Sequence, residues 1–133
     1  YVNNIGFTAS TIIGAGSVVE EAGRFDVVGG TTVDALTVVF THNNFKGLAG
    51  AGSIKNTGVT NTLTVRRTGT DAYGTTAFQE DDVLPGASLV WPMDTALGTA
   101  LPEFSAFTVS VKSKVAGNPT TYGLHHTSHG VMS

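Results

Sequence analysis

Short segments in which apolar and polar residues alternate with a period of two constrain this chain most. Residues 62–67 place Leu63 and Val65 on one face, and residues 107–112 alternate in the same way. Successive side chains of a β-strand point to opposite faces, so each such segment predicts a half-buried strand. No segment of useful length carries the 3.6-residue period of a helix. The chain is therefore expected to be all-β.

The spacing of these segments predicts an antiparallel β-sandwich, Ig-like or jelly-roll-like, of about seven strands. Turn residues separate the segments about every 8–12 positions, as is typical of sandwiches. The glycine- and asparagine-rich run 42–52 and the polar run 68–76 predict loops. The expected strands cover residues 33–41, 53–58, 62–67, 77–79, 89–91, 107–112 and 122–126.

The apolar members of the alternating segments are the expected core, because one face of each strand must pack against the other sheet. They are Leu36, Val38, Phe40, Leu63, Val65, Phe107, Val109 and Val111.

A length of 133 residues suits one domain, which we divide into residues 1–30 and a sandwich over residues 31–133. Charged residues make up 13%, about half the usual share, which indicates a surface partly covered in an assembly. The net charge of −3 and the scattered cations argue against nucleic acid as a partner. No apolar run has the length of a membrane span, so no membrane is expected.

Residues 1–30 lack a strong period but contain scattered apolar side chains and little charge. We expect them to form an irregular arm or edge segment that lies across a neighbouring subunit, in the manner of an added strand. The expected assembly contacts are Ile5, Phe7, Ile12 and Ile13. Within this segment, residues 17–23 fit either one helical turn or a strand end.

Two clusters of polar residues are candidate metal sites. His125, His126 and His129, with His42 elsewhere, carry imidazoles that bind zinc or nickel, but the chain has no cysteine to join them. The acids of residues 80–82 lack the spacing of a calcium loop. We expect terminal polar histidines and a solvated acidic loop, which could also meet a basic patch on a neighbour, and no metal.

No catalytic motif is present, so neither an enzyme nor a cofactor is expected. The sequence contains no G-x-S-x-G, H-E-x-x-H or G-x-x-x-x-G-K-[ST] pattern. The glycines of residues 47–52 have no following helix on which a phosphate could sit, so they predict a flexible loop.

Trp91, the single tryptophan, has two interpretations. An aromatic residue at a strand end commonly fills the core. Alternatively, an exposed indole stacks on a sugar ring, which would favour a carbohydrate-binding module. The exposure of Trp91 separates the two.

The order of three motifs resembles a known family. The motifs are I-K-N-T-G and L-T-V at residues 54–58 and 63–65, L-P-G-x-S at residues 84–88, and S-x-F-T-V-x-V-K-S at residues 105–113. Together they resemble small Ig-like β-sandwich modules of prokaryotic surface proteins and of the virions of tailed bacteriophages. The last motif is most similar to virion proteins of the capsid decoration or cement type. The resemblance covers roughly residues 33–127 and brings no catalytic residue with it.

This resemblance implies a virion structural protein that stabilises a capsid shell through subunit contacts. Its expected partners are the major capsid protein and copies of itself in a homo-oligomer, and its expected location is the virion. The alternative is a glycan- or surface-binding module of a fibre or cell-envelope protein, located at the cell surface.

Overall fold

A computed structural model describes residues 7–9, 17–21, 24–42, 45–70, 74, 76–91 and 106–132, and these contain ten strands and no helix. The strands are β1 (Phe7–Ala9), β2 (Ser17–Glu21), β3 (Arg24–Thr31), β4 (Thr37–His42), β5 (Phe45–Asn56), β6 (Leu63–Thr70), β7 (Thr76–Val83), β8 (Ser88–Trp91), β9 (Ala106–Ser113) and β10 (Thr121–Met132).

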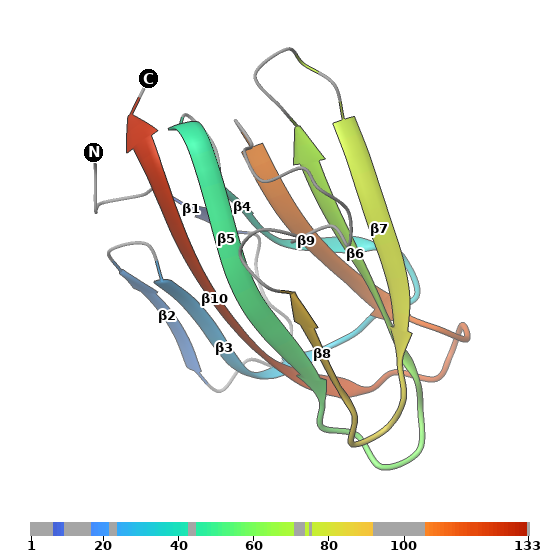
Figure 1. Cartoon of the computed structure of the whole chain (residues 1–133). Coiled ribbons are helices and arrows are strands. Elements are labelled where there is room, and N and C mark those ends of the chain that lie inside the picture. The colour runs from blue at the N-terminus through green and yellow to red at the C-terminus, as the bar shows by residue number, and fades with distance from the viewer. Residues whose placement is uncertain are drawn as a thin grey trace.

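The strands form two five-stranded sheets that face each other (Figure 1). One sheet has the order β1-β4-β9-β6-β7 and the other the order β2-β3-β10-β5-β8, and every pairing is antiparallel. The predicted all-β antiparallel sandwich is therefore confirmed. The described part of the chain has ten strands instead of the expected seven because β1, β2 and β3 are also paired.

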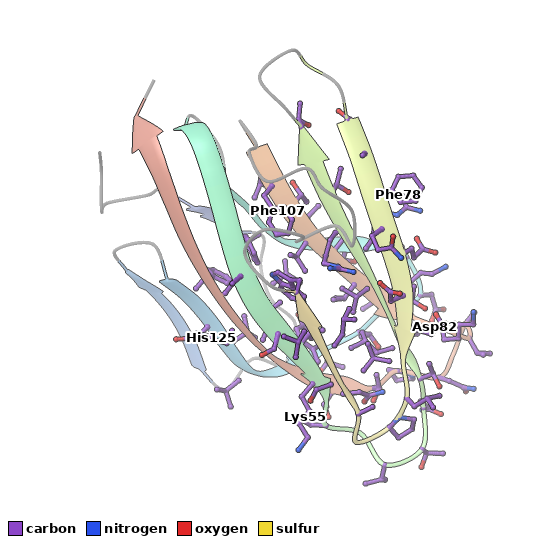
Figure 2. All side chains as sticks on the ribbon, viewed as in Figure 1. Lys55, Phe78, Asp82, Phe107 and His125 are labelled. Atoms are coloured by element: carbon purple, nitrogen blue, oxygen red, sulfur yellow. The ribbon has the colours of Figure 1, made fainter. Side chains whose placement is uncertain are left out.

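The core lies between the sheets, and most of its expected members are buried. Phe40, Leu63, Val65, Phe107, Val109 and Val111 all face the other sheet, and Figure 2 shows Phe107 between the two layers.

The expectation for Leu36 and Val38 is wrong, since both side chains are exposed. Leu36 precedes β4. Val38 lies beside an irregularity in which Val38 pairs with Ser110 but Phe40 already pairs with Val109. This bulge inserts Val39 as an extra residue and buries it next to Phe40, which breaks the simple alternation.

The first half of β5 corrects the expectation of a loop over residues 42–52. Residues 45–52 pair with β10, and Gly52 lies opposite Trp91 of β8. A Cβ at Gly52 would approach Cζ2 of the indole to 2.8 Å. Glycine at this position therefore gives the tryptophan its space, rather than marking a turn.

The N-terminal segment takes part in both sheets. β1 and β2 lie at sheet edges, whereas β3 pairs with β2 and β10 and places Phe25 and Val27 in the core. The expectation that residues 1–30 lie outside the sandwich's own core is therefore wrong for β3, because two of its side chains fill the space between the sheets. Contact of the earlier residues with another chain stays a prediction.

Candidate functional site

One end of the sandwich is organised by the buried side chain of Asn56, the last residue of β5. Its Nδ2 donates to the carbonyls of Asn61 at 2.8 Å and Val83 at 2.9 Å. Its Oδ1 accepts from the backbone N–H of Gly58 at 3.0 Å and from Thr120 Oγ1 at 2.7 Å. One amide thus fastens the β5–β6, β7–β8 and β9–β10 connections to each other.

Further hydrogen bonds link the same connections. Asn61 Nδ2 donates to the carbonyl of Pro119 at 2.9 Å, and the N–H of Lys114 donates to the carbonyl of Thr62 at 3.1 Å. The β3–β4 connection joins them, because Asp34 accepts from the N–H of Gly117 at 2.8 Å. Residues 32–36, 57–62, 84–87 and 114–120 therefore form a fixed surface, which we call the loop end.

The loop end exposes apolar side chains from three different connections. Val59 is 93% exposed, Leu84 is 64% exposed and Val115 is 56% exposed. Its charged residues are Asp34 and Lys114, and Lys114 is paired with Asp82 at 2.8 Å. In Figure 1 the β5–β6 and β7–β8 connections are at the bottom and the β9–β10 connection is at the lower right, away from the end at which β10 finishes.

A second feature is a hollow of about 500 Å³ on the outer face of the sheet β2-β3-β10-β5-β8. One of its lining residues is Gly123 of β10, which lies opposite Lys55 of β5 and has no side chain to fill the space. Figure 2 shows Lys55 and His125 on this outer side, away from Phe107 in the core. The lining residues are Asp26, Val27, Val28, Ser53, Lys55, Thr57, Gly123, Leu124 and His125.

Trp91 is fully buried, so the stacking role considered for it is wrong. It is the inward residue of β8, and its Nε1 donates to Nδ1 of buried His126 at 3.1 Å. The His126 ring stacks on Phe107 with 5.3 Å between centroids. A sugar ring has no access to the indole, whose polar atom is already used inside the core.

The acidic run 80–82 is part of strand β7, not a solvated loop. Neighbouring acids point to opposite faces, and each meets a cation of the same chain. The pairs are Glu80 with Arg66, Asp81 with Arg67 and Asp82 with Lys114, each at 2.8 Å.

The partners of Asp82 also change the pKa of its carboxyl group. The ammonium of Lys114 and the hydroxyl of Thr64 hold the pKa of the Asp82 carboxyl below its ordinary value. The three acids thus form ion pairs with cations of their own chain. A basic patch on a neighbouring subunit would have to compete with these cations.

The histidines do not gather as a cluster. His125 points outward and contacts Asp26, whereas His126 points into the core, so the expectation of terminal polar histidines is wrong for His126. Among the described residues no group of three or more His, Cys, Asp or Glu side chains is placed to hold a metal ion. The side chains of His42 and His129 lie outside what the structure describes.

The expected assembly residues are placed only in part. Ile5, Ile12 and Ile13 lie outside the described residues. Phe7 begins β1 and pairs with His42 of β4 in its own chain. In the described part of the chain there is no helix with the length and apolar character that crossing a membrane requires.

Sequence reasoning missed Asn56 and Gly123. Asn56 stands in an Asn-Thr-Gly run that is typical of a solvent-exposed turn. Gly123 lies inside a predicted strand, where a glycine signals a close approach or an open space without telling which.

Fold and surfaces together define an antiparallel β-sandwich domain with one rigid apolar end and one hollowed sheet face. No family model matches the sequence, and no curated protein matches it. Among solved structures, one described as "Structure of PfGH50B" aligns with 98% of this chain at a TM-score of 0.50 and 10% identity. The chain spans about a quarter of that structure, as the alignment covers 24% of it. This likeness concerns the fold alone.

Proposed function

We propose that this domain is a structural component of an assembled particle and that it associates with copies of itself through the loop end. The observation that carries the proposal is the exposure of Val59, Leu84 and Val115 on connections that Asn56 holds in one conformation. Apolar tips on mobile loops are ordinary. Apolar tips on a hydrogen-bonded platform suit a preformed contact surface, because little backbone freedom is lost when they are buried.

The energetics favour association through this end. Fully burying a valine or leucine side chain contributes about 1.5–3 kcal/mol. Ordering of the loops opposes association little, because their backbone is already tied by hydrogen bonds within the chain. Depletion of charge is also characteristic of the centre of protein interfaces. The loop end has exposed apolar side chains, an ordered backbone and few charged residues.

A virion is the particle that the motif order of residues 54–113 implies, with a decoration or cement role on the capsid. In that role the domain would contact the major capsid protein as well as its own copies. Contacts that exist only in the assembled state stabilise the shell by mass action. The location of the protein would then be the virion.

Methyl NMR tests the proposal directly. The ¹³C-methyl signals of Val59, Leu84 and Val115 should shift or broaden as the protein concentration rises. Val90, which is exposed on a sheet face and not on the loop end, provides the matched control and should not change. Concentration-independent loop-end methyls, or equal changes at Val90, would contradict association through this end.

A further inference from the structure

The hollow around Gly123 brings together polar groups from three neighbouring strands. Asp26 of β3 pairs with His125 of β10, and His125 pairs with Ser53 of β5, so the three lie in one row across the sheet. The Asp26 carboxylate contacts Nδ1 of His125. The next row contains Lys55 opposite Gly123. The strand pairing fixes the backbone positions of these residues, whatever the conformation of the loops.

The chemistry of the lining is mixed and electrically balanced. Asp26 offers a carboxylate acceptor, Lys55 an ammonium donor and Ser53 a hydroxyl that both donates and accepts. Lys55 has no acidic partner among the described residues, so its ammonium is available to a ligand. The opposite charges of Asp26 and Lys55 cancel. Gly123 exposes bare backbone opposite Lys55, and the exposed side chain of Val28 also lines the hollow.

We propose that this hollow is a binding site for a neutral disaccharide, separate from the loop end. A sugar ring presents C–H groups on its face and hydroxyls along its edge. The face fits over Gly123 and Val28, and the edge hydroxyls meet Asp26, Lys55 and Ser53. The volume of about 500 Å³ lies within the range of about 300–1,000 Å³ that is usual for small-molecule sites.

An anionic ligand fits less well. A carboxylate bound by Lys55 would share the hollow with the carboxylate of Asp26, and like charges in one site oppose binding. A purely apolar ligand would cover Lys55 and Ser53 without offering a hydrogen-bond partner to either group. A neutral ligand with several hydroxyls satisfies donors and acceptors together.

The experiment is an amide NMR titration of the full chain with cellobiose, maltose and lactose, and separately with sodium acetate. At least one disaccharide should shift the amides of residues 26–28, 53–57 and 123–125 with a dissociation constant in the millimolar range. Acetate should leave the same amides unchanged. Absence of shifts with all three disaccharides, or shifts with acetate alone, would overturn the proposal.

Gly123→Val is the decisive variant because it adds a side chain to the lining of the hollow. A Cβ at Gly123 would have the carbonyl oxygen of Val27 as its nearest neighbour at 3.6 Å, an ordinary contact, so the sheet should accept it. Binding should fall at least tenfold. Thr68→Val, on the outer face of the other sheet, is the matched control and should bind as the unmodified chain does.

A second variant keeps the test valid if Gly123→Val folds poorly. Lys55→Met retains the aliphatic stem but removes the ammonium donor, and it should weaken disaccharide binding about fivefold or more. Full binding by both Gly123→Val and Lys55→Met would show that the disaccharide lies elsewhere, and the proposal would be wrong.

Discussion

The indole Nε1 of Trp91 donates a hydrogen bond of 3.1 Å to Nδ1 of His126, and both side chains are fully buried between the sheets. Because Nδ1 accepts, it must carry a lone pair, and the ring is therefore neutral with its proton on Nε2. The Phe40 ring lies 4.9 Å from the imidazole between centroids, and the Phe107 ring stacks on it. The imidazole is therefore shielded from bulk water.

Acid should therefore destabilise the protein through His126. In the unfolded chain a histidine takes up a proton below about pH 6.5. In the folded chain protonation of Nδ1 breaks the bond from Trp91 and buries a charge. Stability is thus present above this pH and is lost as the pH falls through it. Urea unfolding at pH 8 and pH 5.5 measures the difference.

His126→Phe isolates this contribution. The variant leaves the Trp91 N–H without its acceptor, which costs about 1–3 kcal/mol at pH 8. It should nevertheless lose less stability than the unmodified chain between the two pH values. His125→Ala should retain the original pH dependence. An unchanged pH dependence in His126→Phe would contradict the role of the buried imidazole.

The adjacent arginines of β6 should differ sharply in their importance. The side chain of Arg67 is 5% exposed, points inward to Asp81 and lies 5.5 Å from the Trp91 ring centroid. Breaking a buried ion pair typically costs about 3–5 kcal/mol. We expect a loss near the lower limit for Arg67→Met, because the side chain of Asp81 is 33% exposed.

Arg66 provides the matched control for Arg67. It is 37% exposed, pairs with Glu80 and lies over the outward-facing ring of Phe78 (Figure 2). Surface pairs contribute about 0–1 kcal/mol, so Arg66→Met should change the free energy of unfolding by about that amount. Chemical denaturation of both variants makes the comparison, and equal losses would show that the burial of Arg67 is unimportant.

Asn56→Ala should weaken the sandwich and loosen the loop end together. The change removes four hydrogen bonds and leaves the carbonyls of Asn61 and Val83 without their donor. Each buried polar group left unsatisfied costs about 1–3 kcal/mol, so a total loss of about 3 kcal/mol or more is expected. Hydrogen exchange of residues 57–62 and 84–87 should accelerate more than that of β9. Unchanged exchange in these connections would contradict the role of Asn56.

Alkali should destabilise the chain through Tyr122. Burial raises the pKa of this phenol to about 12, from an ordinary value of 10.0. The folded chain therefore retains a proton that the unfolded chain releases, and stability falls as the pH rises from about 10 to about 12. The loss should be about 2–3 kcal/mol. Unfolding curves of Tyr122→Phe should not show this loss of stability at alkaline pH. An identical loss in the variant would exclude Tyr122 as its source.

The fold was predictable where alternation is strict. Leu63, Val65, Phe107, Val109 and Val111 are the apolar members of half-buried strands, and a period of two follows directly from strand geometry. Alternation fails at Val39, where a bulge adds one residue, because the position of a bulge is decided by the partner strand.

The glycine-rich half of β5 and the two surfaces were less predictable. Gly52 pairs with β10 and β8, and a side chain there would meet the carbonyl oxygen of His125 and the ring of Trp91, both distant in sequence. The buried role of Asn56 likewise depends on Thr120 and Val83, which reach it through the folded chain. Contacts between residues far apart in the sequence produce no local sequence pattern, so they cannot be predicted from such a pattern.

Sedimentation equilibrium of the unmodified chain and of Leu84→Asp tests most directly whether the loop end is an association surface. The account predicts that the unmodified chain forms an oligomer and that Leu84→Asp is a folded monomer, because a charge placed at this apolar contact is desolvated on association. Val90→Asp, on the outer face of β8, should leave the oligomer intact. A monomeric unmodified chain over the whole concentration range, or an oligomer that survives Leu84→Asp but not Val90→Asp, would contradict it.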